Sequence, residues 1–99
     1  MYKTDNSSLI SLEGLNNLTV INEGFLIENN DALTSLSGLN NLISISDNLN
    51  IYNNYNLMNL YAVHQLITNG QITITEYFAV NNAYNPSHIE IQNIGIGGF

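Results

Sequence analysis

Residues 11–30 read SLEGLNNLTVINEGFLIENN, and residues 35–54 read SLSGLNNLISISDNLNIYNN. They belong to a longer repeat in which Leu9–Ala32 aligns without a gap on Leu33–Asn56, with 12 of the 24 aligned positions identical. A fixed period of this length is typical of repeat proteins, in which each repeat forms one coil that stacks on the next. We therefore expect a first coil over residues 9–32 and a second over residues 33–56.

Each repeat contains a short segment whose apolar residues alternate, as in a β-strand. The segments are Phe25–Glu28 and Leu49–Tyr52. A third candidate, Gln71–Thr75, lies one residue short of the strict spacing. We expect the three strands to pair in parallel, about 4.8 Å apart. Alternation then points Phe25, Ile27, Leu49, Ile51, Ile72 and Ile74 inward, and Leu26, Glu28, Asn50, Tyr52, Thr73 and Thr75 outward.

The repeat changes character after Asn56, so residues 57–99 are expected to form a divergent third coil and cap. Gly38 has its counterpart in Ala62, and alanine favours helix where glycine disfavours it. Apolar residues recur at helical spacing from Leu57 onward, which predicts a helix over about residues 58–68. Asn69-Gly70 would then end it.

The two ends of the chain do not follow the repeat clearly. Residues 1–8 are polar and are expected to be a loose lead-in. Asn85-Pro86-Ser87 suits a turn or the start of a helix, whereas Ile89–Asn93 fits a fourth strand. The sequence leaves both interpretations of residues 85–93 open.

The residues that recur in the repeat have structural explanations. Leucines fill the interior, and each fully buried side chain stabilises the fold by roughly 1.5–3 kcal/mol. Asn30 and Asn54 follow an inward isoleucine by three residues, where a buried amide can bond the backbone of its own turn and of the next coil. Gly14 and Gly38 are expected to allow a positive φ or a tight turn.

The pattern Leu49-x-Ile51-x-x-Asn54 resembles the strand core of leucine-rich repeats. The stretch Leu33–Leu42 is most similar to repeats of the bacterial surface variety and of receptor L domains. The resemblance is close over residues 9–56 and loose over residues 57–77. It implies a β-dominated α/β solenoid, a leucine-rich-repeat-like stack of 24-residue coils with a short parallel sheet. The predicted helix, the following strand and Asn85-Pro86-Ser87 also resemble the C-terminal cap of such domains.

Composition narrows the range of partners. The chain has 99 residues, of which 9% are charged, and Lys3 is its only basic residue. A net charge of −7 disfavours binding to nucleic acid or to an anionic membrane surface. There is no cysteine, and no apolar run is long enough to span a membrane. The 99 residues are expected to form a single domain.

No motif indicates catalysis, a metal or a cofactor. The two histidines, His64 and His88, have no acid or second histidine three or four residues away. We therefore expect no catalytic residues, no metal ligands and no cofactor, and we expect the protein not to be an enzyme.

Two functions fit these observations. The first is a recognition or adhesion module that binds protein or glycan through the outward residues Leu26, Glu28, Asn50, Tyr52, Thr73 and Thr75. The resemblance implies an extracellular or cell-surface location. The second is a structural protein whose uncapped coil ends stack on one another into filaments.

Overall fold

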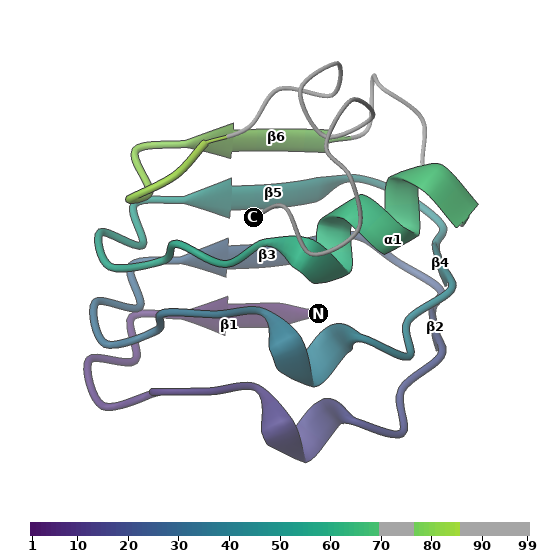
Figure 1. Cartoon of the computed structure of the whole chain (residues 1–99), viewed down its shortest axis with the longest axis horizontal. Coiled ribbons are helices and arrows are strands. Elements are labelled where there is room, and N and C mark those ends of the chain that lie inside the picture. Colours follow the sequence, from purple (N-terminus) through teal and green to yellow (C-terminus); the bar gives the residue numbers. More distant parts are fainter. Residues whose placement is uncertain (70–76, 86–99) are drawn as a thin grey trace.

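The computed structural model describes residues 1–69 and 77–85. It shows a small α/β protein with parallel strands and one α-helix, with extents of 31 × 25 × 22 Å (Figure 1). Along the chain the elements are β1 (Tyr2–Thr4), η1 (Glu13–Leu15), β2 (Val20–Ile21), β3 (Phe25–Glu28), η2 (Ser37–Leu39), β4 (Ser44–Ile45), β5 (Leu49–Tyr52), α1 (Tyr61–Asn69) and β6 (Tyr77–Val80). None of the helices in this part of the chain is long and apolar enough to cross a membrane.

The main sheet has four parallel strands in the order β1-β3-β5-β6. Residues 24 apart lie directly beside each other, so Phe25 pairs with Leu49 and Ile27 with Ile51. A second sheet pairs β2 with β4 at the same spacing. The expected parallel pairing of the two repeats is therefore confirmed.

The core lies between the main sheet and the layer formed by η1, η2 and α1 (Figure 1). Phe25, Ile27, Leu49 and Ile51 point inward and are at most 2% exposed, as the alternation predicted. The recurring leucines meet them from the opposite layer and from the turns. Besides Leu49 of β5, the buried leucines are Leu12, Leu33, Leu36, Leu39, Leu42, Leu57, Leu60 and Leu66.

The Asn-Asn pair at the end of each repeat has two separate tasks. Its first member, Asn29 or Asn53, ends the strand with a φ of 59° or 57°. Asparagine adopts this left-handed conformation more readily than most residues because its short side chain bonds nearby backbone. The second member, Asn30 or Asn54, is completely buried. The pair thus turns the chain sharply and then places an amide in the interior.

The predicted lead-in over residues 1–8 is wrong, because Tyr2–Thr4 forms β1 and extends the sheet. Tyr2 pairs with Leu26, 24 residues later. Asp5 has the same left-handed backbone as Asn29, and Asn6 lies at the position of Asn30. The repeat was hard to see here because the segment shares turn chemistry, rather than apolar residues, with the later repeats.

The sequence placed residues 71–75 beside β5, and the structure places another segment there. The place beside β5 belongs to β6, in which Tyr77 pairs with Leu49. Residues 71–75, with the predicted inward Ile72 and Ile74 and outward Thr73 and Thr75, lie outside the described residues. The spacing between paired residues is 28 here instead of 24, since Asn82 follows Asn54 by 28.

The helix explains the longer spacing. It is confirmed, although it runs from Tyr61 to Asn69 rather than over residues 58–68. Its start follows from Asn59, whose Oδ1 accepts a hydrogen bond from the Tyr61 N–H at 3.0 Å. A helix rises about 1.5 Å per residue and extended chain about 3.3 Å, so a helical connection needs more residues to cover the same distance.

Neither of the two glycines of the repeat has a positive φ, but each lies in a tight 3₁₀ turn, which was the other alternative. At Gly38 a Cβ atom would overlap the carbonyl group of Leu12 in the preceding repeat. At Gly14 nothing lies within 4 Å of that position. Gly38 is therefore required by the close approach of η2 to the first repeat, and Gly14 has no equivalent neighbour.

Candidate functional site: the outward sheet face, its hollow and the asparagine ladder

The outward face of the main sheet consists of two rows of side chains that cross all four strands. The first row is Tyr2, Leu26, Asn50 and Phe78, and the second is Thr4, Glu28, Tyr52 and Val80. Tyr2 is 77% exposed, and Phe78 and Val80 are each 48% exposed. Large apolar side chains in adjacent positions on a sheet are uncommon on a solvent-facing surface and mark contact sites.

Four of the six outward residues predicted from the sequence lie in these rows: Leu26, Glu28, Asn50 and Tyr52. They are partly buried, and the Tyr52 hydroxyl donates a hydrogen bond to Asn50 Oδ1 at 3.2 Å. The remaining two, Thr73 and Thr75, lie outside the described residues. The sequence missed Tyr2, Thr4, Phe78 and Val80, because it predicted no strand over residues 1–8 or 77–80.

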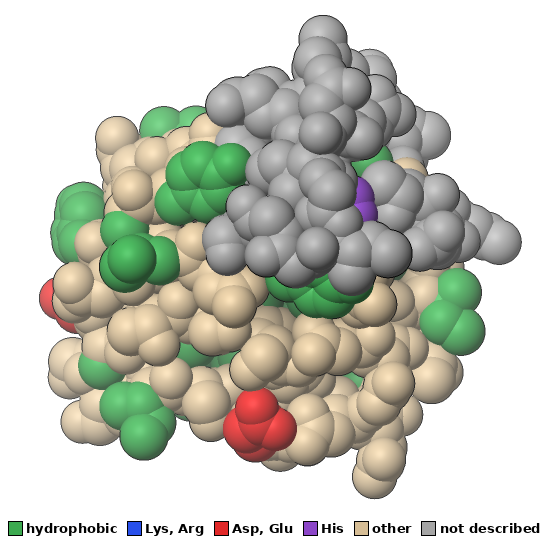
Figure 2. Space-filling view, viewed as in Figure 1, with side chains coloured by type: hydrophobic (Ala, Val, Ile, Leu, Met, Phe, Trp, Pro, Cys, Tyr) green, Lys and Arg blue, Asp and Glu red, His purple; other side chains and the backbone are tan. Residues whose placement is uncertain are grey.

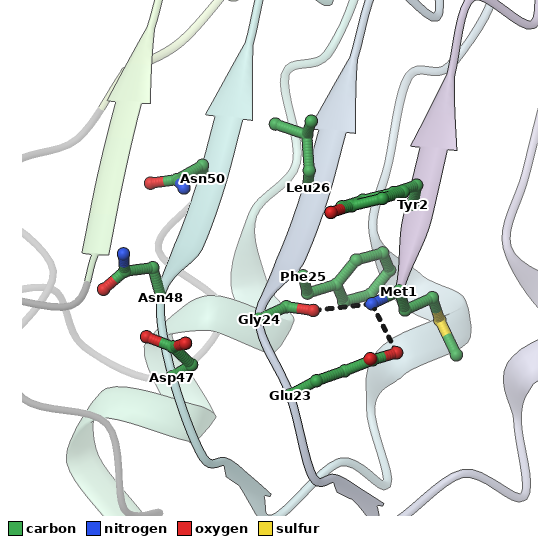
Figure 3. A pocket seen from close by; sticks show the side chains of 9 residues that line it. All are labelled: Met1, Tyr2, Glu23, Gly24, Phe25, Leu26, Asp47, Asn48 and Asn50. Carbon is green, nitrogen blue, oxygen red and sulfur yellow. Dashed lines mark hydrogen bonds and ion pairs between the residues drawn. The ribbon is translucent and has the colours of Figure 1, made fainter.

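A hollow of about 440 Å³ opens where the outward face meets the amino-terminal ends of β3 and β5 (Figure 3). Leu26, Asn50 and Tyr2 line it from the sheet. Below them, Figure 3 shows Glu23 and Asp47 from the two connections that lead into β3 and β5. Glu23 and Asp47 occupy equivalent positions of the two repeats, so the period itself brings both carboxylates to one side of the hollow.

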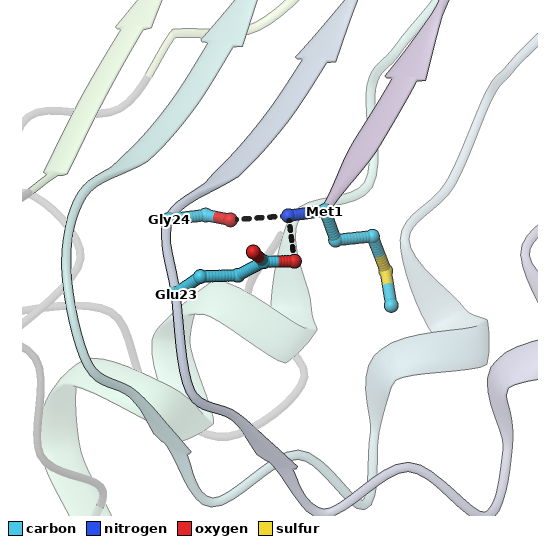
Figure 4. A network of polar contacts seen from close by, with 3 residues as sticks. All are labelled: Met1, Glu23 and Gly24. Carbon is cyan, nitrogen blue, oxygen red and sulfur yellow. Dashed lines mark hydrogen bonds and ion pairs between the residues drawn. The ribbon is translucent and has the colours of Figure 1, made fainter.

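Among the described residues that line this hollow, the amino group of Met1 is the one cation. It donates hydrogen bonds to Glu23 Oε1 at 2.8 Å and to the carbonyl oxygen of Gly24 at 2.6 Å (Figure 4). The Glu23 side chain is 71% exposed, so solvent screens the ion pair and its contribution to stability is small.

The surface away from the sheet is polar and weakly ionic. In the view of Figure 2 most of the described surface is uncharged polar side chain or backbone, with few acidic groups. His64 lies at the inner side of α1, 8% exposed, with its ring stacked on Tyr61 at 5.7 Å between centroids. Across residues 1–69 and 77–85 no three His, Asp or Glu side chains gather as metal ligands would.

The buried asparagines form a continuous ladder of hydrogen bonds along the sheet. The backbone N–H and Nδ2 of Asn30 both donate to Asn54 Oδ1 at 3.1 Å. Asn54 donates in the same way to Asn82 Oδ1, at 3.0 and 2.9 Å. Each Nδ2 also donates to a strand carbonyl of the preceding repeat, as from Asn54 to Ile27. The amides thus satisfy backbone groups that the sheet leaves unpaired.

The ladder is longer than the sequence suggested, because Asn6, Asn82 and Asn85 extend it. Asn6 donates to Asn30 Oδ1 through its backbone N–H and its Nδ2, at 3.3 and 3.2 Å. At the other end, Asn82 donates to Asn85 Oδ1 at 2.8 Å, and Asn85 Nδ2 donates back to the Asn82 carbonyl at 2.9 Å. Asn6 could have been recognised by its 24-residue distance from Asn30.

The chain was compared with protein-family models, with curated proteins and with solved structures, and none of the three comparisons found a match.

Proposed function

We propose that the protein is a non-enzymatic recognition module that binds a protein partner through the outward face of its main sheet. The proposal includes a leucine-rich-repeat-like solenoid, in which each 24-residue repeat is one coil. It is supported by the in-register pairing of residues 24 apart in both sheets. The resemblance to bacterial surface repeats and receptor L domains favours a secreted or cell-surface location.

The observation that carries the proposal is the composition of the outward face. Of its eight side chains, three are aromatic, two are aliphatic and one, Glu28, is charged. Protein interfaces are enriched in aromatic residues and poor in charged ones at their centres. Tyr52 and Phe78 lie diagonally on neighbouring strands, a separation that aromatic side chains can bridge, so one partner surface can contact both.

The parallel strands support the same surface mechanically. Backbone bonds hold all four strands, and the buried asparagine ladder ties the turns at their carboxyl ends. The face therefore changes little in shape, and a partner binds it without a large ordering cost.

A displayed library of folded protein domains provides the test, because such a library can be screened while the partner is unidentified. Domains that bind the chain are selected and their affinities measured against Tyr52→Ala and Phe78→Ala. We expect each substitution to weaken binding about tenfold or more. Tyr55→Ala and Met58→Ala are matched controls, since these side chains are 61% and 65% exposed but lie outside the face. Selected domains that lose affinity only for the control variants would show that the face is not the site.

A glycan array in parallel distinguishes protein from carbohydrate partners. The hollow offers Asn48, Asn50 and Asp47 as hydrogen-bonding groups beside the exposed ring of Tyr2, which suits a sugar. Binding of glycans alone, abolished by Asn50→Ala, would replace the proposed protein partner with a glycan.

Filament formation by end-to-end stacking is the second candidate, favoured by the exposed edge strand β1. Two features weigh against it: the net charge of −7 on every copy, and Asn85, which occupies the donors of Asn82 at the β6 end. Sedimentation at increasing concentration tests it, and fibres or a growing mass would favour stacking.

A further inference from the structure

The asparagine ladder has a direction, and its two ends differ. Every interior asparagine accepts two hydrogen bonds from the preceding asparagine and donates two to the next. It also donates one bond to a strand carbonyl of the preceding repeat. At the β6 end the ladder closes on itself through Asn85. At the β1 end it stops at Asn6.

Within the described residues, Asn6 makes only some of the hydrogen bonds that an interior asparagine of the ladder makes. It donates twice to Asn30 Oδ1, but its own Oδ1 accepts no bond there, and its Nδ2 reaches no strand carbonyl of the kind that Lys3 offers to Asn30. By the pattern of the ladder, these unused groups are the ones that a further strand and a further asparagine would fill.

The backbone of β1 has the same open side. Its bonds to β3 use Met1 O and the Asp5 N–H. Because backbone groups point alternately to the two sides of a strand, the N–H and C=O groups of Tyr2 and Thr4 face away from β3. In the sheet order β1 is a terminal strand, so these groups lie at its edge.

Charge decides what kind of strand fits. Lys3, the only basic side chain of the chain, lies at the register position of the inward Ile27. If two copies joined their β1 strands antiparallel, with Tyr2 opposite Thr4, the two Lys3 side chains would face each other across the join. Like charges in that position are destabilising. An incoming strand with an acidic residue opposite Lys3 has no such cost.

We propose that the β1 edge is a second binding site, separate from the outward face, that takes an extended peptide strand from another protein. The strand runs parallel to β1, places an acidic side chain opposite Lys3, and puts an asparagine on Asn6 Oδ1. This is addition of a strand to a sheet edge, in which main-chain bonds supply affinity and side chains supply selectivity.

The probe is a synthetic peptide with the sequence of Gly24–Leu33 and the substitution Ile27→Glu, acetylated and amidated at its ends. We expect it to slow hydrogen exchange of the Tyr2 and Thr4 amides and to leave that of Ala79 unchanged, since the Ala79 N–H faces away from β5 on the opposite edge strand. A control peptide with the additional substitution Asn30→Leu lacks the amide and should bind about fivefold more weakly or worse.

Reversing the charges on the protein and on the peptide together distinguishes a loss of binding from a loss of folding. Lys3→Glu in the protein should weaken binding of the probe peptide. A peptide with Ile27→Lys in place of Ile27→Glu should restore binding to that variant. Asn6→Ala should weaken the probe as well, whereas Asn41→Ala, which removes an exposed amide bonded to Asn16, should not.

Protection of the Ala79 amide of β6 instead of the β1 amides, or equal binding of all peptides, would overturn the proposal. So would protection of Tyr2 and Thr4 that appears without peptide as the protein concentration rises, since a second copy would then fill the edge. Phe78→Ala separates this inference from the proposed function, because it should impair the outward face and leave peptide binding unchanged.

Discussion

Two neighbouring regions, repeat 33–56 and the following residues 57–85, each add one strand to the main sheet. They do so through different connections. In the repeat the chain passes through η2 and β4 before it enters β5. In the following segment it passes through α1 and enters β6 four residues later than the period requires, at a spacing of 28. Both routes nevertheless end in an inward residue that pairs with the previous strand: Leu49 pairs with Phe25, and Tyr77 pairs with Leu49. Both also add an asparagine to the ladder.

The difference shows which features of the repeat carry the fold. The strand, the left-handed residue after it and an asparagine of the ladder recur from β1 to β6, as Asp5, Asn29, Asn53 and Asn81 have the same backbone conformation. The connection on the opposite side changes freely between a 3₁₀ turn and an α-helix. The sheet side is therefore the invariant part, and the connection only has to cover the core.

Asn54→Leu should have the largest effect, because Asn54 joins the two regions. Leucine removes its bonds to Asn30, Asn82 and the Ile27 carbonyl, and leaves buried groups on both sides unpaired. Each unpaired group costs about 1–3 kcal/mol, so we expect a loss of about 3 kcal/mol or more. Chemical denaturation measures it, with Asn56→Ala as an exposed control. Unfolding of this variant at the parent's midpoint would contradict the role of the ladder.

Gly38→Ala should destabilise the region formed by the two 24-residue repeats, and not residues 57–85. The added Cβ overlaps the Leu12 carbonyl, so the two repeats must move apart, at a cost of about 1–3 kcal/mol. Gly14→Ala is the matched control: no atom lies near its added Cβ, and we expect the free energy of unfolding to stay level or rise slightly. Equal effects of the two substitutions on thermal unfolding would show that close packing of the repeats is not the reason for Gly38.

Asn59→Ala acts on the divergent region. It removes the Oδ1 that accepts the first free N–H of α1, at Tyr61, and should cost about 1 kcal/mol. Urea denaturation checks the value, and Asn40→Ala, an exposed substitution beside η2, provides the reference. A loss of helical circular dichroism without any change at the Leu49 amide in hydrogen exchange would further show that the two regions unfold separately.

Glu23→Gln should have the smallest effect. It removes the ion pair to the Met1 amino group, but Glu23 is 71% exposed and solvent screens the pair. We expect a change of less than about 1 kcal/mol that shrinks further in 1 M salt. A larger, salt-independent loss in thermal unfolding would mean that the hollow beside β3 and β5 stabilises the fold more than its exposure suggests.

The candidate site was predictable only in its central part. Leu26, Glu28, Asn50 and Tyr52 follow from alternation within two repeats that are nearly copies of each other. Tyr2 and Phe78 do not, because β1 has Lys3 where the repeat has an inward isoleucine, and β6 lies 28 rather than 24 residues beyond β5. Apolar periodicity alone does not detect such strands.

The amino-acid sequence by itself determined the 24-residue period, and with it the pairing of β3 with β5 and the burial of the recurring leucines. That information is local and repeated, so each copy reinforces the same apolar pattern. Only the tertiary structure decided that Tyr77–Val80 lies beside β5 and that Asn6, Asn82 and Asn85 join the ladder. One reason is that a helix covers less distance per residue than extended chain, so the strand after α1 lies 28 rather than 24 residues beyond β5. The other is that strand pairing and the asparagine bonds form between segments far apart in the sequence, which only the folded structure brings together.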